Sequence, residues 1–202
     1  MIIREKPSLI IKINNNVYKF LPKNEIKKET NWTKIENKLI RFNQKTSKIN
    51  FKIPKIYSTY FFTKTNYLGK DLFSLGKNIY ELYDSISDFS KIYFNGENTI
   101  SLGDIQLRNI FKNGNYFILN DLGIQAGINV SINYDRARFL VNLIDSNYLK
   151  EAKNIIEKEE DKKSLILEMD KRCLQVFKKR LINLSIFSAL FRLFKYYKWR
   201  FI

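Results

Sequence analysis

The sequence contains no histidine and only one cysteine, Cys173, among its 202 residues. The missing histidine excludes the Ser-His-Asp triad, the Cys-His catalytic pair and every zinc site that needs histidine. A single cysteine excludes an internal disulfide and a cysteine-rich metal site, and it suits a reducing cytoplasm. If the protein is an enzyme, we expect its chemistry to rest on carboxylates, lysine, amides or a hard cation bound by oxygen.

Long apolar runs are also missing. No stretch reaches the roughly 18–20 uninterrupted apolar residues of a membrane span, and the first seven residues carry charge where the apolar core of a secretory signal would lie. We therefore expect a cytoplasmic protein that is soluble or peripheral. Glycine and proline are scarce, with seven and three residues, and 45% of the chain is hydrophobic. This composition excludes disorder as the main state.

Positive charge is in excess, with 36 Lys and Arg against 20 Asp and Glu, a net charge of +16. Such a balance predicts an anionic partner or working surface. The segment Lys171–Ile202 contributes nine basic residues and no acidic one, so the asymmetry is concentrated at this end of the chain.

The basic segment Lys171–Ile202 is predicted to be helical, with one apolar face formed by Leu174, Phe177, Leu181, Leu184, Phe187 and Phe191. One interpretation is a helix docked on the rest of the protein with a solvated basic side. The other is an interfacial helix on the anionic inner face of the cytoplasmic membrane, with Tyr196, Tyr197 and Trp199 at headgroup level. Nucleic acid is a third explanation of the charge, but no RRM or KH signature is present.

The chain reads as an α+β protein with two lobes. The β-type runs 8–13 and 17–21, separated by three asparagines, predict a hairpin, and apolar residues at helical spacing predict a helix from Thr30 or Thr33 to about Lys45. An extended region follows Pro54, and a longer helix begins near Ile79. We expect a small lobe over residues 1–65, a large lobe over 66–170 and a basic extension over 171–202.

Three oxygen-bearing side chains gather around a predicted hairpin. Asp104 and Asn109 precede the turn signal Asn113-Gly114, and Asp121 follows the strand 116–119. A hairpin centred at 113–114 places residue 109 opposite about 118, so that Asp121 returns close to Asn109 and Asp104. Hard oxygen ligands of this kind suit Mg²⁺ bound to phosphates, and a metal-free Asp104 could accept a proton from an attacking hydroxyl.

The segment Gly103-Asp104-x4-Asn109, a hairpin and Asp121-Leu122-Gly123 resembles the catalytic loop and the DFG element of the protein-kinase-like fold. The run Tyr134-Asp135-Arg136-Ala137-Arg138-Phe139 resembles the following helix, whose aspartate holds the catalytic loop. Asn66–Leu72 resembles the hinge between the lobes. The resemblance implies ATP and Mg²⁺ as cofactors, Asp104 as the catalytic residue, and Asn109 and Asp121 as metal ligands.

The resemblance also implies a nucleotide-binding pair. Val17-Tyr18-Lys19-Phe20 resembles the strand that carries the phosphate-binding lysine, and Glu36 stands where the partner glutamate is expected. An alternative is that Lys19 is a solvated charge. Glu36 has its own alternative, because Thr33-x-x-Glu36 is a capping box that would place it at the helix start. In that case Glu29 is the fallback partner.

Among kinase-like families, the chain is most similar to the bacterial lipopolysaccharide core kinases that phosphorylate heptose or Kdo. The glycine before Asp104 and the 13 residues between Asp121 and Asp135 carry this similarity, because so short a segment leaves little room for a peptide-binding activation loop. It implies an anionic glycolipid or sugar acceptor. Leu102 replaces the usual histidine, Leu122 replaces the phenylalanine of DFG, and no glycine-rich phosphate loop is present. A RIO-like or tRNA-modification kinase and a non-catalytic kinase-fold binding protein remain alternatives.

Overall fold

The computed structural model describes residues 2–5, 8–20, 33–45, 50–59, 62–66, 68–120, 126–182 and 186–200. The chain divides into two compact units, the first formed by Met1–Lys77 with Leu102–Ile128 and the second by Asn78–Ser101 with Asn129–Ile202. The predicted lobes, 1–65 and 66–170, are contiguous, whereas the observed units alternate along the chain. The segment 102–128, which carries the predicted site, therefore belongs to the same unit as the N-terminal sheet.

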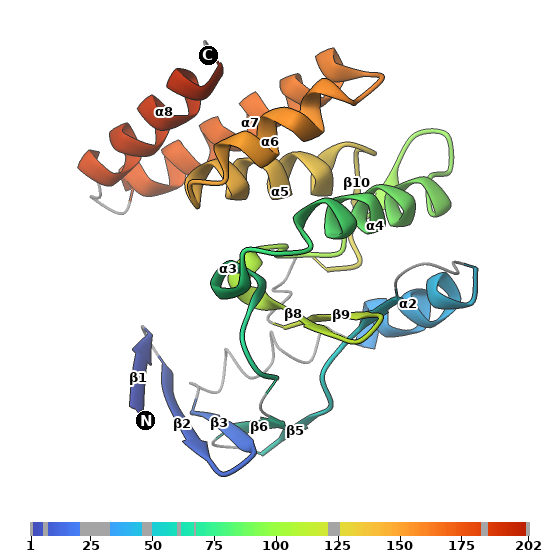
Figure 1. Ribbon diagram of the computed structural model, residues 1–202, viewed down its shortest axis with the longest axis vertical. Helices are drawn as coiled ribbons and strands as arrows, with labels where there is room; N and C mark the ends of the chain where they lie inside the picture. Colours follow the sequence, from blue (N-terminus) through green and yellow to red (C-terminus); the bar gives the residue numbers. More distant parts are fainter. Residues whose placement is uncertain are drawn as a thin grey trace. The chain divides into compact units, whose positions relative to one another are not determined.

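The first unit contains an antiparallel five-stranded sheet (Figure 1). Its spatial order is β1 (Ile2–Glu5), β2 (Ser8–Ile13), β3 (Asn16–Phe20), β6 (Phe62–Asn66) and β5 (Ile56–Ser58). The hairpin predicted around the asparagines is confirmed, since Ile13 pairs with Asn16 and Asn14 takes a positive φ of 52°, a conformation that asparagine tolerates. The extended region after Pro54 forms two strands, β5 and β6, that pair with each other.

A second sheet of the first unit carries the predicted site. It has the order β4 (Asn50–Lys52), β9 (Tyr116–Leu119) and β8 (Ile110–Asn113), with β4 parallel to β9 and β8 antiparallel to it. Helix α2 (Thr33–Lys45) packs against β4 and buries Ile35, Leu39 and Phe42, the spacing that predicted it. The described part of α2 thus confirms the amphipathic helix.

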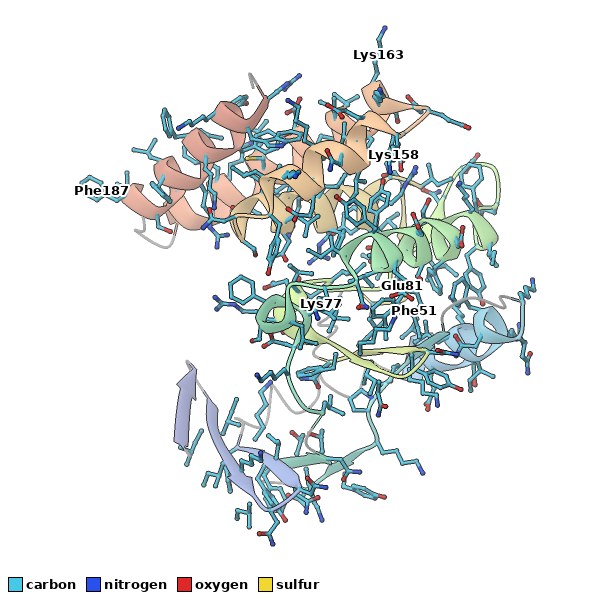
Figure 2. All side chains as sticks on the ribbon, viewed as in Figure 1. Phe51, Lys77, Glu81, Lys158, Lys163 and Phe187 are labelled. Atoms are coloured by element: carbon cyan, nitrogen blue, oxygen red, sulfur yellow. The ribbon has the colours of Figure 1, made fainter. Side chains whose placement is uncertain are left out.

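Asn43 joins α2 to β4 through two hydrogen bonds. Its Nδ2 donates to the carbonyl oxygen of Phe51 at 2.7 Å, and its Oδ1 accepts from the amide of Phe51 at 2.9 Å. The ring of Phe51, labelled in Figure 2, lies between Phe42 of α2 and Phe117 of β9, with centroid distances of 5.6 and 6.2 Å. Because all three rings are buried, α2 is fixed to β9 through Phe51.

The second unit is mostly helical (Figure 1). Its helices are α4 (Ile79–Ile92), α5 (Tyr134–Asp145), α6 (Leu149–Glu157), α7 (Lys162–Ile182) and α8 (Ile186–Arg200), and its short strands are β7 (Thr99–Ile100) and β10 (Asn129–Val130). Helix α5 contacts each of the other four helices and is buried over most of its length. It is therefore the centre of this unit.

A partly buried polar network crosses the second unit. The Glu159 carboxylate accepts a hydrogen bond from the Tyr83 hydroxyl at 2.6 Å and pairs with Arg136 at 2.9 Å. Arg136 also donates to the side-chain oxygen of Asn133, whose Nδ2 donates to the Ser164 hydroxyl at 2.8 Å. Burial and the bond to Glu159 raise the pKa of Tyr83, so this hydroxyl stays protonated. The network links α4 and α5 to the start of α7.

The C-terminal segment forms two helices, which corrects the single apolar face predicted for it. Because α7 ends at Ile182 and α8 begins at Ile186, helical spacing does not continue from Phe177 to Phe187. Helix α8 packs on α5 and α7. Arg192 pairs with Asp145 at 2.8 Å, and Arg200 pairs with Asp170 at 2.6 Å. Leu184 lies outside the described residues.

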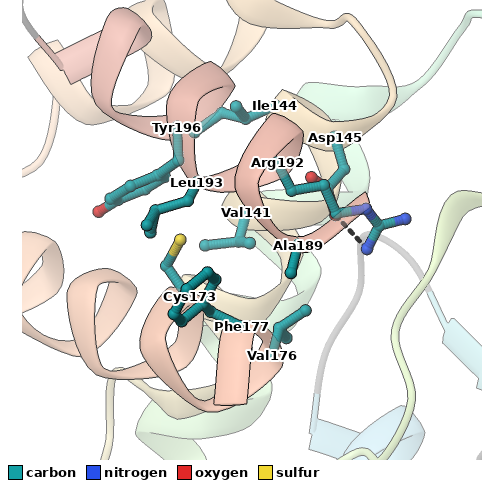
Figure 3. Close-up of a pocket in the computed structure, with 10 residues that line it drawn as sticks. All are labelled: Val141, Ile144, Asp145, Cys173, Val176, Phe177, Ala189, Arg192, Leu193 and Tyr196. Carbon is teal, nitrogen blue, oxygen red and sulfur yellow. Dashed lines mark ion pairs between the residues drawn. The ribbon is translucent and has the colours of Figure 1, made fainter. Parts of the chain in front are cut away.

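Figure 3 shows the packing of α8 around Cys173. A cavity of only about 10 Å³ lies there, bordered by α5, α7 and α8, with Val141, Phe177 and Tyr196 among its lining residues. Burial, with a smaller contribution from the carboxylates of Asp145 and Asp170, raises the pKa of Cys173 to about 11. Cys173 is therefore a core residue, and its thiol is less acidic than that of a free cysteine.

We predict that Asn43→Ala lowers the free energy of unfolding by about 1–3 kcal/mol, because the amide and carbonyl of Phe51 both lose their side-chain partner. Urea unfolding of the full chain measures this loss. Asn37→Ala, at an exposed position of the same helix, is the matched control and should change stability by less than about 0.5 kcal/mol. Equal effects of the two substitutions would show that Asn43 does not clamp α2 to β4.

Candidate functional site

The loop of residues 102–109 leads from β7 to β8 and carries Asp104. Leu102, Ile105 and Leu107 are buried, whereas Asp104 is only half-buried. Gly103 has a φ of 103°, a backbone conformation that L side chains rarely adopt. Backbone geometry therefore explains the glycine before Asp104. Gly103 lets the chain turn between the buried Leu102 and Ile105 and leaves the Asp104 carboxylate accessible.

Gln106 orients Asp104. Its Nε2 donates to Oδ2 of Asp104 at 2.7 Å, and its backbone amide donates to the carbonyl of Asp104 at 3.0 Å. The carbonyl oxygen of Gln106 accepts from the amide of Asn109 at 2.8 Å. Gln106 thus connects the predicted catalytic residue to a predicted metal ligand. Sequence reasoning missed it, because a glutamine between two motif positions carries no signal until the loop has a shape.

Asn109 ends the short 3-10 helix η2 (Leu107–Asn109) and lies directly before β8. The amide of Asn120 donates to the carbonyl oxygen of Asn109 at 2.7 Å. This pairing corrects the predicted register, in which residue 109 faced about 118. Ile110 pairs with Leu119 and the turn is Gly114-Asn115, because Gly114, with a φ of 56°, occupies the first turn position.

Asp121, the second predicted metal ligand, lies outside the described residues. The described chain ends here at Asn120, which is bonded to Asn109, so the residue before Asp121 is fixed beside the other predicted ligand. An amide and a carboxylate oxygen are a donor set that fits Mg²⁺. Among the described residues no group of three or more acidic, cysteine or histidine side chains could hold a metal.

Asp135 anchors the chain that leads into the loop. It is fully buried in the first turn of α5, and its Oδ1 accepts a hydrogen bond from the Ser101 hydroxyl at 2.8 Å. The resemblance implies an aspartate here that holds the backbone of the catalytic loop. The observed contact is with the side chain of Ser101, the residue directly before the loop, so the role toward the loop backbone stays a prediction. Ser101 itself was not identified from sequence, since an isolated serine has many ordinary roles.

The segment predicted as a hinge lies beside β8. Asp71 forms an isolated antiparallel bridge with Phe111, and its side chain caps helix α3 (Leu72–Leu75) by accepting from the amide of Ser74 at 2.7 Å. The guanidinium of Arg108 lies 4.6 Å from the ring centroid of Phe73, a cation–π distance. These contacts fix the segment after Gly69 against the strand that follows the Asp104 loop.

Lys19 lies on β3, between β2 and β6, and pairs with the buried Thr63. Residues alternate between the faces of a strand, so Lys19 lies opposite Tyr18 and Phe20, whose rings each contact Phe62 at 5.6 Å. The half-buried lysine is thus on the face away from this aromatic cluster. Its predicted role toward phosphates stays a prediction.

Glu36 lies in the first turn of α2, and its side chain is exposed. Ile35 and Leu39 of the same helix are buried, and the predicted pairing of Glu36 with Lys19 stays a prediction. Glu29, the fallback partner, lies outside the described residues.

Comparison of the sequence with known families and with curated proteins finds no match. Solved structures do resemble the fold. Aminoglycoside 2'-phosphotransferase-IIIa, in its GDP complex, matches with a TM-score of 0.63 and 11% identity, covering 94% of this chain and 89% of that one. A ternary complex of streptomycin, ATP and the phosphotransferase APH(2")-IIa matches with a TM-score of 0.51 and 8% identity, with the same two coverages.

Identities this low show the fold alone, but the matches extend over nearly the whole length of both chains. They agree with the order of elements in this chain, an N-terminal sheet followed by a mostly helical C-terminal part. The chain therefore has the α+β, two-lobed, protein-kinase-like fold that the aminoglycoside phosphotransferases share.

Proposed function

We propose that the protein is an ATP-dependent phosphotransferase that acts on a hydroxyl group. The observation that carries this proposal is the geometry of the Asp104 loop. The half-buried Asp104 follows Gly103, which has a positive φ, and the backbone carbonyl of Asn109 accepts a hydrogen bond from Asn120, the residue before Asp121. By their resemblance to the catalytic loop and DFG element of kinase-like proteins, Asp104 would be the catalytic base, and Asn109 and Asp121 would be the metal ligands. The two similar structures contain GDP and ATP, which supports a nucleotide as the donor.

Each residue has a separate role in this proposal. Asp104 would accept the proton of the attacking hydroxyl, with Gln106 fixing the orientation of its carboxylate. Asn109 and Asp121 would hold Mg²⁺, which neutralises the phosphate oxygens when bound. Lys19 would contact the α- and β-phosphates, with Glu36 as its partner.

For the acceptor we propose a sugar hydroxyl of lipopolysaccharide core, heptose or Kdo. The glycine before Asp104 and the 13 residues between Asp121 and Asp135 support a small acceptor, because a peptide needs a longer platform. Aminoglycosides, on which the similar proteins are named to act, are also sugars with free hydroxyls. A protein or tRNA-associated acceptor and a non-catalytic binding role are the competing proposals.

We predict that ATP raises the melting temperature only when Mg²⁺ or Mn²⁺ is present. A ligand at about 100 times its Kd adds about 2.7 kcal/mol, or roughly 5–10 °C for a chain of this size. Asp121→Asn should abolish this shift, because the cation loses a carboxylate ligand. Asp88→Asn, an exposed position on α4, is the matched control and should keep it. A full, metal-independent shift in Asp121→Asn would contradict the metal assignment.

Asp104→Asn should keep the Mg²⁺-dependent shift and reduce phosphate transfer by roughly 10²-fold or more, the scale of a lost general base. ADP release, measured with inner-core lipopolysaccharide, an aminoglycoside and tRNA as separate acceptors, gives the rate and identifies the acceptor class. Loss of nucleotide binding in Asp104→Asn would instead assign Asp104 to the metal or to the fold. If the wild-type chain binds ATP but transfers to none of the acceptors, the lipopolysaccharide assignment fails and the non-catalytic role gains support.

A further inference from the structure

Helix α8 has two apolar sides, an inner side that is packed and an outer side that is exposed. Its inner side buries Ala189 and Tyr196 against α5 and α7, as Figure 3 shows, and the ion pairs of Arg192 and Arg200 fix it there. Phe187, Phe191 and Phe194 recur at spacings of four and three, so they share one face of the helix. That face is the outer side.

The three phenylalanines of the outer side are exposed by 90%, 69% and 68%. Figure 2 shows Phe187 projecting from α8, away from the neighbouring helices. Large apolar side chains gathered on one exposed face of a helix are typical of an interaction site. The inner side is already packed, so the exposed side is not a misplaced core face.

A groove continues the outer side toward α6. It has a volume of about 480 Å³, and its apolar wall is formed by Leu149, Phe191, Phe194 and Trp199. Trp199 adds a large aromatic ring to this wall, with its indole nitrogen buried. Phe187 lies outside the groove, so the apolar stripe extends beyond it along the helix.

Lysines form the rim of this groove. Lys150 and Lys153 come from α6, and Lys195 and Lys198 come from α8, while no carboxylate is among the described residues that line it. The Lys195 ammonium donates to the backbone carbonyl of Asp145 at 2.8 Å, which holds this cation at the rim. The surface thus combines an apolar centre with a purely cationic edge.

We propose that the outer side of α8, together with this groove, docks the protein on an anionic lipid membrane. The lysines would contact lipid phosphates while the phenylalanines enter the boundary between headgroups and acyl chains. Charge complementarity selects an anionic surface. The exposure of Phe187 beyond the groove favours a membrane over a peptide, because a peptide held in the groove would leave Phe187 uncovered.

This attachment is peripheral and independent of the proposed phosphate transfer. Among the described residues no helix is long and apolar enough to cross a membrane. Helix α8 would lie parallel to the bilayer plane, since its inner side stays packed on α5 and α7. A lipid-linked acceptor would then be brought to the enzyme in two dimensions, but docking itself needs neither nucleotide nor acceptor.

The test is co-sedimentation of the full chain, without nucleotide, with vesicles of phosphatidylglycerol and phosphatidylcholine or of phosphatidylcholine alone. We expect binding to the anionic vesicles only, and weaker binding as salt rises. Replacing Lys150 and Lys198 by Gln should weaken binding by roughly fivefold for each lysine. Lys163→Gln, an exposed lysine at the start of α7 (Figure 2), is the matched control and should have less effect.

The apolar part is tested by the combined substitutions Phe187→Ser, Phe191→Ser and Phe194→Ser, which should abolish binding. Leu167→Ser, at a 56% exposed position of α7, is the control and should bind as the wild type does. Melting temperatures verify that each variant is folded. If the triple variant unfolds, the single substitution Phe187→Ser, at the most exposed of the three positions, replaces it. Phe187→Ser should then weaken vesicle binding, whereas Leu167→Ser should not.

Three results would overturn the proposal. The full chain could ignore anionic vesicles at low salt, or the phenylalanine variants could bind as strongly as the wild type. In the third result, the wild-type chain does not bind vesicles, and light scattering shows a dimer that the phenylalanine substitutions dissociate. A second copy of this chain would then be the partner that covers the surface.

Discussion

The hydrogen bond between the Asn120 amide and the Asn109 carbonyl is the contact on which the candidate site depends. It closes the β8–β9 hairpin at the end where the Asp104 loop enters, so the loop and the chain before Asp121 meet at one point. Strand β9 is held by β4, and β4 is held by Asn43 of α2. The candidate site is therefore built on packed strands and a helix, and the short loop 102–109 holds Asp104 and Asn109 at its edge.

Much of the fold could be predicted from sequence because local signals agreed with the final packing. The apolar spacing of Ile35, Leu39 and Phe42 predicted α2, and the asparagines after Ile13 predicted the first hairpin. The glycine before Asp104 was recognised as a motif position, and its φ of 103° supplies the physical reason. Such features need only the residues next to them along the chain, so a single sequence contains the information.

Other features depend on contacts between distant segments, and sequence could not supply them. The register of β8 and β9 differs by two residues from the prediction because Gly114, and not Asn113, occupies the first turn position. The apolar period of the C-terminal segment did not reveal that the chain forms two helices, which leaves Phe187 exposed instead of in one continuous face with Phe177. The contacts of Gln106 with Asp104 and of Ser101 with Asp135 exist only once the loop has its folded shape, so the sequence alone does not reveal them. Lys19 and Glu36 rest on the resemblance.

The most direct test of the central claim is to place the metal–nucleotide complex on the protein. Mn²⁺ added with a non-hydrolysable ATP analogue should broaden the backbone amide resonances of Asn109 and Asn120 in a ¹⁵N-labelled sample, because a paramagnetic ion strongly relaxes nearby nuclei. The effect should require the nucleotide and disappear in Asp121→Asn. Nucleotide binding without broadening at these two amides, or broadening that persists in Asp121→Asn, would show that the Asp104 loop and its hairpin do not form the phosphate-transfer site.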